Sequence, residues 1–428
     1  MCRRWRSVVF QSPRRLNLRL LCTPRTLARN ALDIWPPLPL VIRDINDIDY
    51  CEPSGIDNII AALEHNDRVG QIKLKYLSSL ELGHVTNSAV IRKSFPELTD
   101  LRLRLFLENE PSPILPDSFL GGTAPRLRLL DLRGVPFPGL PKLLLSTTHL
   151  VNLDLYRIPH SVYIPPEVMA TTLSALTSLE SLRLHFRYPR PRPALDSRRL
   201  RPPPLTRSIL FSLTKIRFKG ASEYLEEILA QIDAPRLHGM NIVFFNQIIF
   251  DLPQLFQFAS RSPTLRAAQE GRIAFYFGES VVRLSSDYGV LSVNIPCIAR
   301  EWQLSSLDQV CTSSLPPLST LEVLYIVADW EGGHRWPDDV ENTLWLDLLR
   351  SFVAVKNLYL LQSLVPRIAS ALQELVGERT TEVLPTLENI YLEDFQTSRL
   401  LHEGIKKFVA ARQFTGHIAI SRWDRDED

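Results

Sequence analysis

The segment LTDLRL at residues 98–103 carries leucine at its first, fourth and sixth positions. The same spacing recurs in segments that begin at Leu127, Leu150 and Leu179, with starts 29, 23 and 29 residues apart. Successive side chains of an extended strand point to opposite faces. Positions four and six of each segment therefore face one side, and the chain repeats a short strand with one apolar face.

Weaker copies of this pattern begin at Leu213 and Leu237 and, after a break, at Leu321, Val355 and Leu387. Apolar residues at helical spacing occupy residues 56–63, 225–232, 344–352 and 368–375, between the strand segments. Strands and helices recur every 23 to 34 residues, spacings that bracket and slightly exceed the period of leucine-rich repeats. Each element needs its neighbours to bury its apolar face. The sequence thus predicts an α/β, leucine-rich-repeat-like solenoid, with a curved parallel sheet on the concave side and helices on the convex side.

The predicted repeats are irregular. Phe106, Val135 and Ile158 stand where a regular repeat has asparagine, so no asparagine ladder is expected. Residues 272–296 read as three short strands separated by glycine-containing turns, which predicts a short β-rich insertion or edge. Residues 188–204 are rich in Pro and Arg and predict a surface loop. We assign residues 14–428 to the repeat domain, with an acidic tail at 422–428.

Composition narrows the class of protein. Charged residues make up 22% and hydrophobic residues 45% of the 428 positions, as in ordinary globular proteins. No apolar run approaches the length of about 18 residues that predicts a membrane span, so we expect no membrane partner. The five cysteines include no CxxC pair, which disfavours a zinc site or disulfide framework and favours a reducing compartment, cytoplasmic or nuclear.

The first thirteen residues contain a recognisable spacing. Cys2, Trp5, Arg6 and Pro13, with Val9 between them, match the ending of an F-box, close to V-C-x-x-W-R-x-x-x-x-x-x-P. The segments SPRRLNLRLLCTPRT, ALDIWPPLPLVIR, NIIAALEHNDRV, SSLPPLSTLEVLYI and ENTLWLDLLRSFVAVKNLYL extend the likeness along the chain. The sequence resembles the F-box proteins of mushroom-forming fungi that carry irregular leucine-rich repeats.

This resemblance implies a substrate receptor of a cullin-RING ubiquitin ligase. In such receptors the F-box binds the adaptor subunit of the ligase, and the repeat domain presents a target protein. An F-box has three helices in roughly 40 residues, a size too small to form a core when helices are missing. Residues 1–13 are therefore expected to be the remnant of its last helix. The alternative is a free-standing repeat scaffold, or a truncated paralogue, with no ligase connection.

The strand pattern also names the residues of the concave groove. Positions three, five and seven of each copy point away from the core, and in the N-terminal copies they are mainly basic. In the last three copies position five is tyrosine, which is a favoured anchor in protein interfaces. Cross-strand packing is the alternative role for these rings. The predicted partner-binding residues are Arg102, Arg104, Arg133, Tyr156, Arg183, Arg217, Tyr325, Tyr359 and Tyr391.

Other classes of function find less support. The sequence has no GxSxG, Walker, HExxH or GxGxxG motif, so we expect no enzyme, no cofactor and no metal. The basic groove could bind nucleic acid, but it lacks a nucleic-acid-binding motif, and a solvated face or an acidic protein partner is favoured. The first 32 residues hold eight arginines and also fit a mitochondrial transit peptide. The F-box ending explains the same residues more specifically.

Overall fold

The structure is a computed structural model that describes residues 18–32, 37–44, 53–106, 113–187, 207–245, 249–314, 316–329, 342–375, 379, 381–393, 399–412 and 418–423. By its internal contacts the chain divides into two units, residues 1–199 with 208–213 and residues 200–207 with 214–428. We describe each unit by itself. The predicted F-box remnant at 1–13, the Pro- and Arg-rich loop at 188–204 and the acidic residues 424–428 lie outside the described residues.

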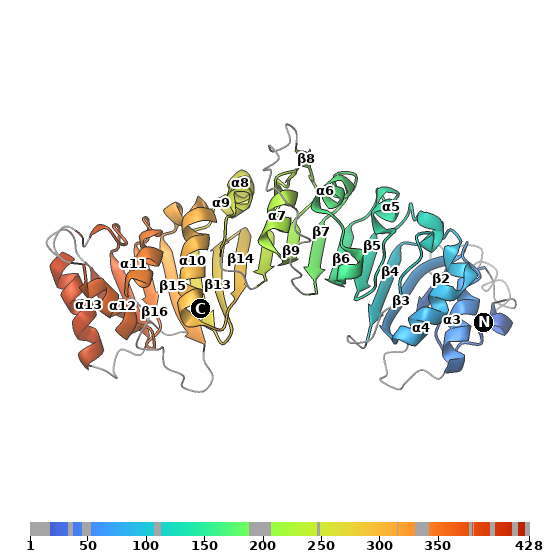
Figure 1. Cartoon of the computed structure of the whole chain (residues 1–428), viewed down its shortest axis with the longest axis horizontal. Coiled ribbons are helices and arrows are strands. Elements are labelled where there is room, and N and C mark those ends of the chain that lie inside the picture. Colours follow the sequence, from blue (N-terminus) through green and yellow to red (C-terminus); the bar gives the residue numbers. More distant parts are fainter. Residues whose placement is uncertain are drawn as a thin grey trace, which may run out of the picture. The chain divides into compact units, whose positions relative to one another are not determined.

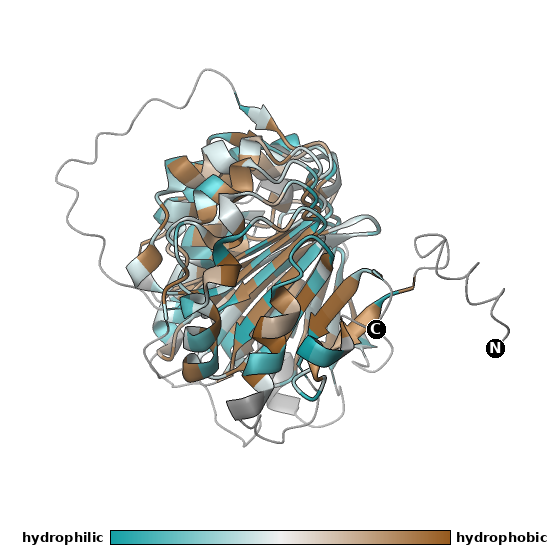
Figure 2. Cartoon of the chain, turned by 90° about the vertical axis from the view of Figure 1, so that its right-hand side faces the viewer, coloured by the Kyte–Doolittle hydropathy of each residue, from teal (hydrophilic) through white to brown (hydrophobic). Residues whose placement is uncertain are grey.

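The first unit is a parallel sheet with helices on one face (Figure 1). Its sheet strands, in spatial and sequence order, are β1 (Leu20–Cys22), β2 (Leu40–Arg43), β3 (Val69–Leu77), β4 (Asp100–Leu105), β5 (Leu129–Arg133), β6 (Asn152–Ile158) and β7 (Ser181–Phe186). The connections contain α2 (Ala28–Ala31), α3 (Pro53–Leu63), α4 (Ser79–Asn87), η1 (Ala89–Arg92), η2 (Phe119–Gly122), α5 (Leu140–Leu145), η3 (His160–Val162) and α6 (Pro166–Ser174), and β8 (Ser208–Ile209) follows. In Figure 2, brown apolar residues recur on these strands and on the flanking helices.

The second unit has a sheet in the order β9-β11-β14-β13-β12-β15-β16-β17-β18. The strands are β9 (Lys215–Gly220), β11 (Gly239–Phe244), β12 (Glu270–Tyr276), β13 (Glu279–Ser286), β14 (Gly289–Pro296), β15 (Val323–Asp329), β16 (Asn357–Leu360), β17 (Asn389–Glu393) and β18 (Ala419–Trp423), with β10 (Ile232–Asp233) apart. The helices are α7 (Ser222–Leu229), α8 (Pro253–Arg261), α9 (Pro263–Arg266), α10 (Arg300–Ser314), η4 (Pro316–Thr320), α11 (Asn342–Arg350), α12 (Val365–Gln373) and α13 (Arg399–Arg412). In each unit we call the sheet face opposite the helices the open face.

The predicted repeat strands are confirmed. The nine segments from Leu98 to Leu387 form β4, β5, β6, β7, β9, β11, β15, β16 and β17, and positions four and six are buried, as at Leu101 and Leu103. The four predicted helical stretches overlap α3, α7, α11 and α12. The sequence analysis overlooked β3, although Val69, Ile72 and Leu74 have the same spacing.

A backbone contact holds neighbouring repeats in register where asparagine is missing. The carbonyl oxygen of Thr99, at position two of one repeat, accepts hydrogen bonds from the N–H groups of Arg128 and Leu129 in the next repeat, at 2.9 and 3.1 Å. Buried carbonyl groups need such partners. The same double acceptance recurs along both units, at the carbonyl oxygens of Arg128, Val151, Thr214, Gln269, Glu322 and Lys356.

The predicted β-rich stretch forms three strands in the middle of the second sheet, so an edge position is wrong. β12, β13 and β14 make an antiparallel meander. β14 pairs in parallel with β11, and β12 pairs in parallel with β15. The chain enters the meander at β12, the strand farther from β11, and returns through β13 to β14, which lies beside β11. Both flanking pairs are therefore parallel. Gly278, in the turn between β12 and β13, has a φ of 85°, a conformation that glycine adopts without strain.

We expect the core leucines to dominate stability. Leu153 on β6 is 1% exposed, whereas Leu80 on α4 is 77% exposed. Leu153→Ala should lower the free energy of unfolding by about 2–5 kcal/mol, because it removes buried contacts and leaves a cavity. Leu80→Ala is the matched control and should change it by less than about 0.5 kcal/mol. Urea unfolding of both variants measures the difference, and equal losses would contradict the assignment of the core.

A partly buried carboxylate joins two helices of the second unit. Glu226 on α7 accepts hydrogen bonds from the backbone N–H groups of Gln254 and Leu255, at 2.7 and 2.8 Å, in the first turn of α8. Burial raises the pKa of Glu226 from 4.5 to about 7, although these two N–H groups favour the charged form. The repulsion of Asp251 also raises this pKa.

This raised pKa makes stability depend on pH. The folded protein binds more protons at Glu226 than the unfolded chain does between the two pKa values, so stability should fall as pH rises from about 4.5 to about 7. Glu226→Gln should flatten that part of the profile, while Glu223→Gln on the same helix should not. Urea midpoints measured across this pH range test the expectation, which fails if the Glu226→Gln profile keeps the original slope.

Candidate functional site

On the open face of the first unit, the predicted arginines lie in rows that also contain acidic residues. Position five of successive strands is occupied by Lys73, Arg102, Asp131, Asp154 and Arg183, which lie side by side in register. Arg102 lies 3.0 Å from the carboxylate of Asp100, and Lys73 lies 3.1 Å from the same group. Arg183 lies 2.8 Å from Asp154. Aspartates of the same face thus neutralise much of the basic row that the sequence predicted.

Position seven of these strands shows the same neutralisation. Arg104 forms an ion pair with Asp131, a carboxylate that is largely buried. The hydrogen bond to Asp131 raises the pKa of Arg104, which keeps the guanidinium charged. The guanidinium of Arg133 lies 4.8 Å from the ring centre of Tyr156, and the ring of Tyr156 meets His185 edge to face at 4.2 Å. Among the predicted residues, Arg102 and Arg104 are thus paired with aspartates, and Arg133 and Tyr156 contact each other.

The three predicted tyrosines of the second unit form a stacked ladder. The ring centres of Tyr325 and Tyr359 are 4.5 Å apart, and those of Tyr359 and Tyr391 are 4.3 Å apart with nearly parallel planes. The strand register places all three directly side by side. The rings are half-buried, so much of their surface packs against neighbouring side chains. Cross-strand packing is the alternative role that the sequence indicated.

Trp423 on β18 covers part of this ladder. Its ring centre lies 5.7 Å from that of Tyr325 and 5.5 Å from that of Tyr359. Trp423, Ala274 and Val327 are buried together on the open face, with the tyrosines packed around them. The sequence analysis missed Trp423 because β18 does not follow the apolar spacing of the other repeats. We call Tyr325, Tyr359, Tyr391 and Trp423 the aromatic cluster.

Cationic side chains lie beside the aromatic cluster. Arg217 occupies position five of β9, and the same row continues through Asn241 and Ser292. It then reaches Arg283 on β13 and Arg272 on β12, which are directly opposite each other, and Arg272 is paired in register with Tyr325. The sequence analysis missed this pair. The two-residue turn Phe277–Gly278 would have revealed it, because a hairpin turn fixes which residues face each other.

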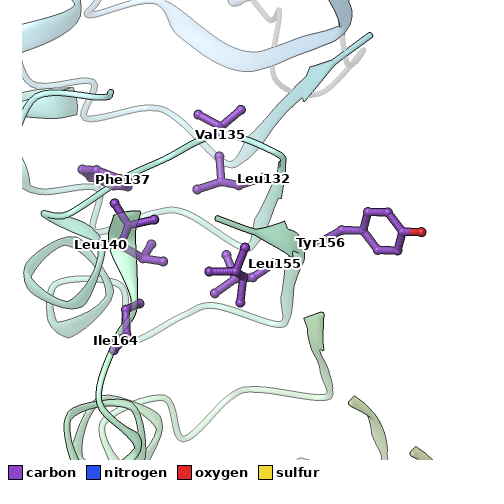
Figure 3. Close-up of a pocket in the computed structure, with 9 residues that line it drawn as sticks. Leu132, Val135, Phe137, Leu140, Leu155, Tyr156 and Ile164 are labelled. Carbon is purple, nitrogen blue, oxygen red and sulfur yellow. The ribbon is translucent and has the colours of Figure 1, made fainter. Parts of the chain in front are cut away.

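The described residues offer little for binding a small ligand or a metal. A small apolar hollow between the repeats of β5 and β6 is lined by leucine, isoleucine, valine and phenylalanine side chains, and Tyr156 points away from it (Figure 3). Among the described residues, no group of three or more His, Cys, Asp or Glu could hold a metal ion. No described helix is both long and apolar enough to span a membrane. The F-box residues Cys2, Trp5, Arg6, Val9 and Pro13 lie outside the described part.

Comparison with known proteins finds only distant structural likeness. No family model matches the chain, and no curated protein matches it. Among solved structures it is similar to the leucine-rich-repeat-containing protein LegL7 from Legionella pneumophila, with 13% identity and a TM-score of 0.30 over 84% of each chain. At that level of similarity the likeness carries no argument about function. The assignment of the fold rests on the strands and their register.

The tyrosine ladder should contribute to stability. Tyr359 stacks on both neighbouring rings and also contacts Trp423. Tyr359→Ala should therefore lower the free energy of unfolding by about 1–3 kcal/mol, since each aromatic pair contributes about 0.5–1.5 kcal/mol beyond burial. Tyr288→Ala, at a turn where the side chain is 74% exposed, is the control and should have little effect. If urea unfolding showed the two variants to be equally stable, the ladder would have no structural role.

Proposed function

We propose that the chain is a non-catalytic protein-interaction module that binds a target protein on its open face. The observation that carries this proposal is the aromatic cluster, which lies beside arginines on a face that none of the described helices of the same unit covers. Tyrosine and arginine are the residue types most often found at the energetic centre of protein interfaces. Parallel strands in register hold these side chains at fixed spacing, which favours recognition of a complementary surface.

We further propose that the protein acts as a substrate receptor of a cullin-RING ubiquitin ligase. The support is the spacing of Cys2, Trp5, Arg6 and Pro13, which resembles the end of an F-box, together with the likeness of the whole chain to fungal F-box proteins. The proposed location is the cytoplasm or the nucleus. Cys22, Cys297 and Cys311 support this location, because they are unpaired and buried, as expected in a reducing compartment.

Co-purification tests the ligase role. The tagged chain, alone and with any upstream coding sequence restored, should recover the adaptor subunit and the cullin. Substitution of both Trp5 and Arg6 by alanine should abolish this recovery, because these residues match the adaptor-binding end of the F-box. The control, Trp302→Ala, changes a half-exposed tryptophan on α10 and should leave recovery intact.

The result also separates the two proposals. If neither form of the chain recovers the adaptor, the ligase role is wrong. In that case, a target protein that still binds, and is lost when Tyr391 is changed to alanine, would identify a free-standing scaffold. Loss of the adaptor in the Trp5 and Arg6 variant with unchanged target binding would assign the two activities to different parts of the chain.

A further inference from the structure

Two arginines oppose each other on the open face of the second unit, and neither forms an ion pair with any residue that the structure describes. Arg272 on β12 and Arg283 on β13 are directly paired in the antiparallel ladder, and both side chains lie on the same face. Like charges directly opposite each other destabilise a sheet. Within the part of the chain that the structure describes, no ion pair or hydrogen bond involves either guanidinium. Glu270 lies two residues before Arg272 on the same face, and no ion pair joins the two.

Comparable arginines in the first unit are neutralised by acidic neighbours. There the neighbouring strands supply aspartate, as Asp154 does for Arg183 and Asp131 for Arg104. In the second unit the strands that flank the arginine pair supply Ser292, opposite Arg283, and Tyr325, opposite Arg272. The counter-charge that the sheet supplies in one unit is therefore missing from the corresponding positions in the other.

We propose that Arg272 and Arg283 bind a carboxylate-rich segment of the partner protein, an inference that rests on the proposed function. Two guanidinium groups on adjacent strands can each offer a planar pair of N–H donors, which matches the geometry of a carboxylate. Binding would also relieve the repulsion between the two cations.

The surroundings of the pair fit an extended acidic peptide. Lys215, Arg217 and Lys219 lie on the same face of β9, three strands from Arg283, or about 14 Å away. Asn241 and Ser292 lie between them and offer hydrogen bonds to a peptide backbone. On the other side the aromatic cluster begins at Tyr325. A peptide with several carboxylates followed by an apolar residue would match the basic residues and then the aromatic cluster.

A titration with defined probes tests the proposal on the full chain. The probes are fluorescent ten-residue peptides of glutamate, of glutamine and of alternating glycine and phosphoserine, and a ten-nucleotide single-stranded RNA. The glutamate peptide should bind, more weakly as salt rises, and the glutamine peptide should not. Arg283→Ser and Arg272→Gln should each weaken binding of the glutamate peptide by about tenfold or more. Arg126→Gln in the first unit, an exposed arginine whose partner is Glu97, is the matched control and should leave binding unchanged.

The unfolding temperature is a second measurement, and it distinguishes a binding role of these arginines from a purely structural one. Because the two cations repel each other, Arg283→Ser should unfold at the same or a higher temperature than the unchanged chain while its binding is lost. A lower unfolding temperature of Arg283→Ser, with unchanged binding in both variants, would overturn the proposal. Arg283→Lys keeps the charge without the planar donors and should bind with intermediate strength.

The other possible results of the titration also test the proposal. Absence of glutamate-peptide binding would overturn the proposal, as would a phosphoserine peptide or RNA that binds through these arginines when the glutamate peptide does not. The titration needs no adaptor subunit, so its failure leaves the ligase test of the proposed function standing. Conversely, a failure to recover the adaptor would not contradict binding of the glutamate peptide to Arg272 and Arg283.

Discussion

The constraint on which the molecule depends is that no single repeat can bury its own apolar face. A strand of five or six residues buries positions four and six only when the next strand and its helix pack beside it. The backbone fixes how neighbours meet. A carbonyl group at position two of one repeat accepts two N–H groups from the next, and this contact recurs from Thr99 to Lys356 within the two units. Because it involves only the backbone, it tolerates the loss of asparagine at the ninth position, where Phe106, Val135 and Ile158 now stand.

The same register determines the chemistry of the open face. Residues at equal positions in successive strands become neighbours, so the identity of one position along the repeats defines a row across the sheet. In the first unit the row contains both basic and acidic residues, and its charges are largely paired on the same face, as in the pair of Arg183 and Asp154. In the second unit the row changes from cations to stacked aromatic rings at Arg272 and Tyr325. One backbone arrangement thus produces a self-compensated surface and a surface with unmatched charge.

The sequence predicted the repeats well because their signal is local and periodic. Apolar residues at positions one, four and six identified nine strands between β4 and β17, and the helical spacing of apolar residues identified α3, α7, α11 and α12. The open-face contacts were harder to predict, because charge pairing depends on which strands are neighbours. Asp131 and Arg104 are 27 residues apart and meet only through strand order. Trp423 lies on a strand whose apolar spacing departs from the pattern. Arg272 and Arg283 were missed although their turn fixes the pairing, because the meander was treated as peripheral to the repeats.

The meander of β12, β13 and β14 has a consequence for how the second unit folds. A regular solenoid can grow one repeat at a time, since each strand pairs with the strand just before it in sequence. Here Met240 pairs with Leu291, and Ile273 pairs with Ile326, so both connections span about fifty residues. Strand pairing cannot extend beyond β11 until β14 has formed beside it, and β15 has no preceding partner strand until β12 has formed. The three strands must therefore form together, which makes this region one cooperative folding block within an otherwise modular array.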